Sequence, residues 1–144
     1  MSHISRMKLK VYKLDALATA GEKHGLRMEK RSTHKWYGQF MGDYPLPEGI
    51  TKDDLGRCDY VLFLPNNPDA YEVGVKLMPD GSYTLLWDFW EGGFGLEEAI
   101  GENGVKLISE YEATVYREVM IEQGFEVSEV VHANGTRELT ATQW

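Results

Sequence analysis

Alternating apolar and polar residues predict most of the strands in this chain. Short alternating or continuous apolar segments, rich in β-branched and aromatic side chains, are typical of strands. They occur at residues 7–12, 26–30, 60–64, 71–78 and 83–90. Asn134-Gly135 favours a tight turn, so residues 125–131 and 136–143 are predicted to form a final hairpin.

The register of the central hairpin can be predicted from its turn. Pro79-Asp80-Gly81 suits a type I turn followed by a left-handed glycine, which gives a three-residue loop. A register slip of one residue would exchange the two faces of the strands. The three-residue loop pairs Leu77 with Tyr83, Val75 with Leu85, Val73 with Trp87 and Tyr71 with Phe89. All of these pairs are apolar and lie on one face, which we therefore predict to be core.

Two helices are predicted from apolar spacing and from their end signals. Asp15 is a candidate N-cap, and Gly25 is placed to end the first helix in the left-handed conformation. The second helix is predicted over residues 103–123, with Gly124 ending it. Residues 91–95 contain three glycines and are interpreted as a flexible connector.

The order of these elements predicts one α+β domain spanning residues 1–144. We expect an antiparallel sheet with two main helices packed on one face, of ferredoxin-like or related type. The chain has 144 residues, of which 42% are hydrophobic and 26% are charged. These values are close to the globular average and indicate a folded chain.

The charge balance argues against nonspecific binding to nucleic acid. The formal net charge is −8, and a surface this negative repels a phosphate backbone. Most of the basic residues nevertheless fall in the N-terminal third, which leaves a local anion or nucleic-acid site as a weaker alternative. They are Lys8, Lys10, Lys13, Lys23, Arg27, Lys30, Arg31 and Lys35.

Cys58 is the only cysteine, so the chain can form neither an intrachain disulfide nor a cage of thiolates around a metal. This pattern fits a reducing compartment. The first residues lack the apolar run of a signal peptide, and no stretch reaches the length of a membrane span. We therefore predict a cytoplasmic protein that does not contact a membrane.

Two carboxylates are candidate site residues on the second face of the central hairpin. In the predicted register Glu72 lies opposite Asp88, and like charges directly opposite destabilise a strand pair unless something neutralises them. An arginine such as Arg27 or Arg31 would neutralise the two carboxylates, and exposure to solvent would screen them. The functional alternative is a divalent metal, a cationic ligand or a general acid with a raised pKa.

Aromatic residues are concentrated in two segments and form a second candidate site. Trp90 is expected near the surface, with Trp36, Tyr37 and Phe40 on a loop. Exposed aromatics beside glycines are typical of binding surfaces. The alternative is that the loop packs over Trp90 and hides both.

His3 is a third candidate because it lies close to the amino terminus. With Met1 retained, the terminal amine, two backbone amides and the His3 imidazole could chelate copper or nickel. The alternative is that His3 belongs to an N-terminal segment docked on the sheet. The other histidines have no ligand spacing, and the serines and Cys58 lie in no nucleophile motif. We therefore predict no resident metal and no cofactor.

Several short segments resemble one protein family. They are Met1-Ser2-His3-Ile4-Ser5, Tyr71-Glu72-Val73-Gly74, Tyr83-Thr84-Leu85-Leu86-Trp87-Asp88, Gly124-Phe125-Glu126-Val127 and the final Trp144. Together they resemble the family called hypothetical chloroplast reading frame thirty-five, found in plastids, cyanobacteria and some phages. Residues 36–57 depart from the plastid pattern and look more like the phage branch. The resemblance implies an intracellular single domain with a partnered, accessory role, and it assigns no reaction.

Three functional hypotheses follow. The first is a non-enzymatic binding or adaptor domain that contacts a protein partner through the aromatic loop and Trp90, with self-association through an open sheet edge compatible with it. The second is a metal-binding protein or enzyme centred on Glu72, Asp88 and His3. The third, weaker one is a nucleic-acid binder that uses the basic N-terminal third.

Overall fold

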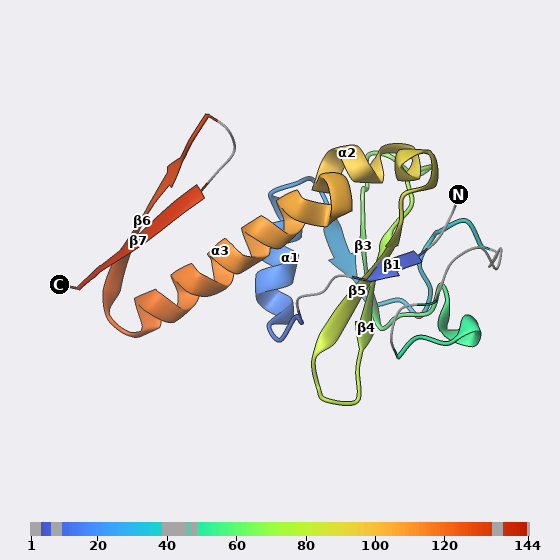
Figure 1. Ribbon diagram of the computed structural model, residues 1–144, viewed down its shortest axis with the longest axis horizontal. Coiled ribbons are helices and arrows are strands. Elements are labelled where there is room, and N and C mark those ends of the chain that lie inside the picture. The colour runs from blue at the N-terminus through green and yellow to red at the C-terminus, as the bar shows by residue number, and fades with distance from the viewer. Residues whose placement is uncertain (1–3, 7–9, 39–45, 47–48, 134–136, 144) are drawn as a thin grey trace.

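The structure is a computed structural model that describes residues 4–6, 10–38, 46, 49–133 and 137–143 (Figure 1). Helices are labelled α, short 3-10 turns η and strands β. In chain order the elements are β1 (Ile4–Arg6), α1 (Leu14–Glu22), β2 (Arg27–Glu29), η1 (Lys52–Asp54), β3 (Tyr60–Phe63), β4 (Val73–Leu77), β5 (Tyr83–Asp88), η2 (Trp90–Gly95), α2 (Leu96–Ile100), η3 (Glu102–Gly104), α3 (Val105–Glu122), β6 (Phe125–Val131) and β7 (Arg137–Gln143).

Five strands form an antiparallel sheet in the order β1-β5-β4-β3-β2, so β2 to β5 make a meander. The predicted register of the central hairpin is confirmed, since Leu77 lies opposite Tyr83 and Val75 opposite Leu85. Gly81 has the left-handed φ of 87° that the three-residue loop requires. The α+β class is confirmed.

The first strand lies earlier in the chain than its alternation predicts. Pairing with β5 involves Ile4–Arg6, and Val11 makes only an isolated bridge, to Tyr83. The rest of the predicted strand, residues 7–9, lies outside the described residues. Helix α1 also begins earlier than predicted, at Leu14, with Lys13 and not Asp15 at its N-cap.

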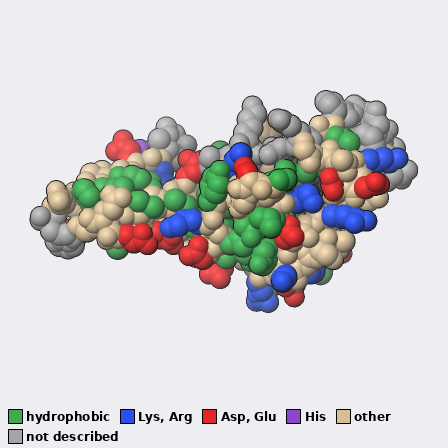
Figure 2. All heavy atoms as spheres, turned by 90° about the horizontal axis from the view of Figure 1, so that it is seen from below, with side chains coloured by type: hydrophobic (Ala, Val, Ile, Leu, Met, Phe, Trp, Pro, Cys, Tyr) green, Lys and Arg blue, Asp and Glu red, His purple; other side chains and the backbone are tan. Residues whose placement is uncertain are grey.

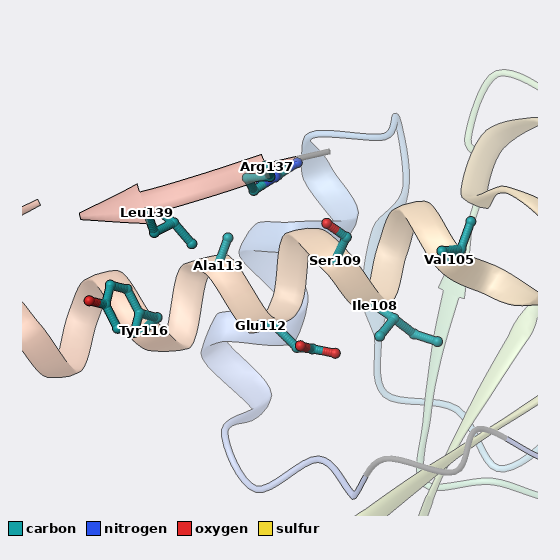
Figure 3. A pocket seen from close by; sticks show the side chains of 8 residues that line it. All are labelled: Val105, Ile108, Ser109, Glu112, Ala113, Tyr116, Arg137 and Leu139. Atoms are coloured by element: carbon teal, nitrogen blue, oxygen red, sulfur yellow. The ribbon is translucent and has the colours of Figure 1, made fainter. Parts of the chain in front are cut away.

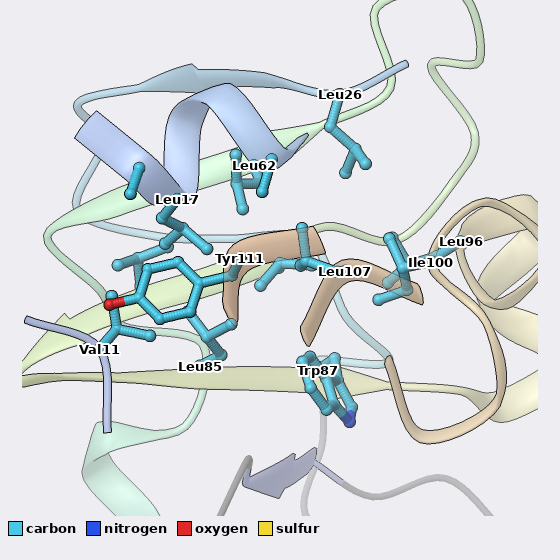
Figure 4. Packing of buried hydrophobic residues seen from close by; sticks show 14 of the residues in the cluster. Val11, Leu17, Leu26, Leu62, Leu85, Trp87, Leu96, Ile100, Leu107 and Tyr111 are labelled. Atoms are coloured by element: carbon cyan, nitrogen blue, oxygen red, sulfur yellow. The ribbon is translucent and has the colours of Figure 1, made fainter. Parts of the chain in front are cut away.

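The helices pack on one face of this sheet, and the main core lies between them (Figures 1 and 4). Leu85 and Trp87 of β5 meet Leu107 and Tyr111 of α3 there, and Leu17 of α1 joins them. The predicted core face is confirmed for Tyr71, Val73, Val75, Leu85 and Trp87, which are all buried. It is wrong for Leu77, which is 48% exposed at the free end of the hairpin, beyond the reach of the helices.

The opposite face of the sheet is also covered. Leu86 is fully buried there beneath Ile50, Trp36 and Leu55, which come from the chain between β2 and β3. Thr51 and Asp54 form a capping box at η1. Neither alternative for the loop describes Trp36, which packs on the second face of the sheet in the cluster of Leu86 and not over Trp90.

The last part of the chain forms an arm, defined as the C-terminal half of α3 with the β6–β7 hairpin. The buried residues of α3 all fall between Leu107 and Thr114, so its second half extends beyond the core. The predicted final hairpin is confirmed, but β6 and β7 form a separate two-stranded sheet and do not join the main one. Figure 1 shows this hairpin at the far end of α3, away from the five-stranded sheet.

Candidate functional site

The segment that follows β5 is a left-handed turn, and the expectation of a flexible connector is wrong. Glu91, Gly92, Gly93 and Phe94 have φ between 52° and 65°, inside η2. For a residue other than glycine this conformation costs about 1–2 kcal/mol. Hydrogen bonds hold the turn: the Tyr71 N–H donates to the Gly93 carbonyl at 2.8 Å, and Asn67 Nδ2 donates to the Phe94 carbonyl at 3.0 Å.

Asp88 anchors the start of the same turn from inside the protein. Its side chain is fully buried at the end of β5. Oδ1 accepts a hydrogen bond from the Trp90 N–H at 3.0 Å, and Oδ2 accepts one from the Tyr37 N–H at 3.1 Å. Charge-assisted bonds of this kind offset the cost of burying a carboxylate. Asp88 therefore joins two segments that are distant in sequence.

Four aromatic rings meet above this anchor and form what we call the aromatic patch: Tyr37, Tyr71, Trp90 and Phe94. Their ring centroids are 5.3 Å apart for Tyr37 and Trp90, 5.8 Å for Trp90 and Phe94, and 5.3 Å for Tyr71 and Phe94. All of these contacts are edge-to-face, a geometry that aromatic rings favour. Tyr37 is 38% exposed and Phe94 45%, so the patch presents ring surface to solvent.

Glu72 does not lie opposite Asp88 in the sheet, because β4 begins one residue later, at Val73. It pairs instead with the segment that covers the sheet: its N–H donates to the Lys35 carbonyl, and its carboxylate accepts from the Lys35 N–H at 2.8 Å. Arg31 lies 3.3 Å from the same carboxylate, as the neutralising alternative predicted. No cluster of three or more potential metal ligands occurs within the described ranges.

His34 was not predicted from the sequence to be a site residue, yet it binds the segment that covers the sheet to strand β4. The ring is buried, its Nδ1 lies 3.1 Å from the Glu72 carbonyl, and its Nε2 has no hydrogen-bond partner. Gly74 makes room for the ring, because a Cβ at this position would lie 2.5 Å from His34 Cδ2. Burial lowers the pKa of His34, and the nearby Glu72 opposes this only in part.

An acidic hollow of about 620 Å³ adjoins the aromatic patch. It shares Glu91, Gly92 and Gly95 with the left-handed turn. Its other lining residues are Glu97, Glu98, Gly101, Glu102 and Lys106. Four glutamates against one lysine make the surroundings of the patch negative.

The predicted site residues therefore do not form one site. Trp90 and Tyr37 belong to the patch, and Asp88 accepts hydrogen bonds from the N–H groups of both. Glu72 bonds instead to the backbone of Lys35. Trp36 packs into the second face of the sheet, away from these contacts. Phe40 and His3 lie outside the described residues.

Tyr71 and Phe94 complete the patch and were not among the predicted binding residues. The alternation of the strand indicated that Tyr71 belongs to the core. The glycines around Phe94 were the available signal, since they permit a left-handed turn that presents the residue between them.

Comparison with protein-family models, with curated proteins and with solved structures finds no match to this chain. Within the part of the chain that the structure describes, no helix has the length and apolarity needed to cross a membrane.

Proposed function

We propose that this protein is a small binding or adaptor domain that docks a protein partner on the aromatic patch. The observation that carries the proposal is a set of rings from three chain segments whose backbone is held by a buried carboxylate while Tyr37 and Phe94 stay exposed. Aromatic side chains in such surfaces dominate the energy of many protein interfaces.

The backbone of Phe94 supports this proposal. Its φ of 55° would suit glycine at no steric cost, whereas phenylalanine there is strained. The ring nevertheless lies 45% exposed, so it recovers only part of this cost by packing within the chain. Strain that presents an exposed aromatic side chain is typical of a functional site.

The surroundings of the patch indicate the sign of the partner's charge. The acidic hollow beside Trp90 and Phe94 carries four glutamates, and the whole chain has a formal net charge of −8. A partner with basic side chains around an apolar contact would be complementary, and a phosphate backbone would be repelled. This favours a protein partner over nucleic acid.

The cytoplasm is the compartment that we propose for this interaction. The only thiol, Cys58, is buried and donates to the Arg31 carbonyl at 3.3 Å, which suits a reducing environment. Membership of the reading-frame-thirty-five family stays a prediction from the short segments described above, as does the organisation of the chain as one domain.

Affinity capture from the native host, with quantification of bound proteins, tests the proposal. The variants are Phe94→Gly and Trp90→Ala, and the control is Tyr12→Ala, which removes a ring that is 64% exposed outside the patch. A purified partner should lose roughly 30-fold or more in affinity on loss of a central aromatic residue.

Phe94→Gly is the sharper variant because it relieves the backbone strain while deleting the ring. We expect the free energy of unfolding to stay within about 1 kcal/mol of that of the original chain, since the relief offsets the lost packing. Partner binding should nevertheless be lost. A partner that binds Phe94→Gly and Trp90→Ala as well as the original chain would refute the proposal.

A further inference from the structure

A second surface, independent of the aromatic patch, lies between α3 and the β6–β7 hairpin. Helix α3 and strand β7 border an open groove of about 650 Å³ (Figure 3). The floor is one stripe of α3, and β7 supplies one wall. The lining residues are Val105, Ile108, Ser109, Glu112, Ala113, Tyr116, Arg137 and Leu139.

The groove lies where a third strand of the small sheet would run. Strand β7 pairs with β6 on one edge, and within the described part of the chain its other edge pairs with no strand. Figure 3 shows β7 running alongside α3, with Leu139 directed toward Ala113. The groove is lined from β7 and not from β6, so it adjoins the unpaired edge. An unpaired edge of seven residues offers N–H and C=O groups to an incoming strand.

The spacing of the helix stripe matches the spacing of side chains on a strand. Ile108, Glu112 and Tyr116 follow one another at intervals of four residues on α3, which is about 6 Å along a helix. Alternate side chains of a strand are about 6.7 Å apart. Three successive inward-facing residues of an added strand would therefore meet Ile108, Glu112 and Tyr116 in turn.

The charges of the groove specify the middle residue of such a strand. Arg137 is held by Glu110 at 3.0 Å and by Glu129 at 3.1 Å. Glu112 is exposed and takes part in no ion pair with any described residue. Val105 nearby is 58% exposed, and Ile108 and Tyr116 are half-buried. The floor thus presents an apolar residue, an anion and an aromatic residue in sequence.

We propose that the unpaired edge of β7 accepts an extended segment of a partner protein whose inward-facing side chains are apolar, cationic and apolar, at positions i, i+2 and i+4. The cation pairs with Glu112, and the flanking apolar side chains cover Ile108 and Tyr116. The added strand also gives the β6–β7 hairpin the third strand that isolated two-stranded sheets need for stability. Figure 2 shows hydrophobic side chains on the arm bordered by acidic ones, consistent with a partner of positive charge.

The probe is a synthetic heptapeptide with blocked ends, Thr-Val-Thr-Lys-Thr-Val-Thr, and a counterpart with Glu in place of Lys. Titration into the isotopically labelled full chain, followed by amide NMR, should shift the resonances of residues 137–143 and of the α3 stripe. The Lys peptide should bind at least about fivefold more tightly than the Glu peptide. Glu112→Lys should reverse this preference.

The matched control is Glu126→Lys, which makes the same charge change on an exposed residue of β6, outside the groove. It should preserve the preference for the Lys peptide. The proposal is overturned by any of three results: no saturable shift up to about 1 mM peptide, shifts confined to the aromatic patch, or an unchanged preference in Glu112→Lys. A fourth overturning result is a dimer in solution whose β7 amides are already protected from hydrogen exchange, because a second copy would then occupy the edge.

Discussion

Asp88→Asn is the substitution that most directly tests how the aromatic patch is held. The change keeps the size of the side chain and removes its charge and one of its two acceptor oxygens. In the folded chain one oxygen accepts from the Trp90 N–H at 3.0 Å and the other from the Tyr37 N–H at 3.1 Å. An asparagine can satisfy only one of these donors, and its NH₂ group would face the other.

The expected cost follows from burial. Asp88 is fully buried, so water cannot replace the lost acceptor. A hydrogen bond to a charged group contributes about 1.5–3 kcal/mol, and a buried donor left unsatisfied costs about 1–3 kcal/mol. Asp88→Asn should therefore lower the free energy of unfolding by roughly 2–4 kcal/mol. For a chain of this size that corresponds to a fall in Tm of about 5–15 °C.

Urea unfolding followed by tryptophan fluorescence measures this effect, and amide NMR locates it. The shifts of Tyr37 and Trp90 should change most, because their N–H groups lose the carboxylate. Partner binding at the patch should weaken in parallel, since the rings would no longer be held in place. Asp69→Asn is the control, because it removes the same charge from an exposed residue.

The contrary outcome is a free energy of unfolding within about 0.5 kcal/mol of that of the original chain, with unchanged Tyr37 and Trp90 amide resonances. That outcome would refute the conclusion that this carboxylate organises the patch. An equal loss of unfolding free energy in Asp69→Asn would instead indicate that the change in net charge is the cause.

Gly104→Ala should lower the free energy of unfolding by about 1–2 kcal/mol because Gly104 has a left-handed φ of 70°. It should lower it by roughly 1–3 kcal/mol more because the new Cβ would lie 2.5 Å from Trp87 Cη2. Gly81→Ala, with a φ of 87° and no atom within 4 Å, should show only the first cost, and calorimetric Tm values compare the two. Burial lowers the pKa of His34 below its ordinary value of 6.5, so the unfolded chain takes up the proton more readily. Stability should therefore fall as the pH drops below about 6.5, and His34→Gln should reduce this fall, as urea midpoints at pH ~7.5 and ~5.5 would show. Burial raises the pKa of Cys58 from 9.0 to about 11. The folded thiol should thus react with a disulfide reagent at least about 100-fold more slowly than the urea-unfolded thiol, and an equal rate would contradict its burial.

Local spacing was sufficient to predict the central hairpin and its register. Leu77 meets Tyr83, as the three-residue loop and the alternation of apolar residues require. Both signals lie within about fifteen residues of sequence, and a slip of one residue would exchange the two faces. The long helix and the final hairpin were predictable for the same reason, since periodicity and turn residues act locally.

The candidate site was predictable only in part. Trp90 and Tyr37 were identified from aromatic density, but the role of Asp88 was not, because its hydrogen-bond partners include an N–H group 51 residues away. Glu72 and Asp88 were expected to be opposite because the predicted strand began at residue 71, whereas β4 begins at Val73. The main chain of Glu72 bonds instead to Lys35, in a segment whose path depends on distant contacts.

The sequence by itself thus determined the class of fold, the pairing of the central strands and the face that meets the helices. Only the tertiary structure decided three further features: that the second face is covered, that η2 turns left-handed, and that β6 and β7 leave the main sheet. Each depends on contacts between residues far apart in the chain. Glycines at η2 permit a left-handed turn, but it forms here because Asn67 and Tyr71 bind its carbonyls and Asp88 holds its first N–H. A local pattern can allow such a conformation, and only its distant partners can select it.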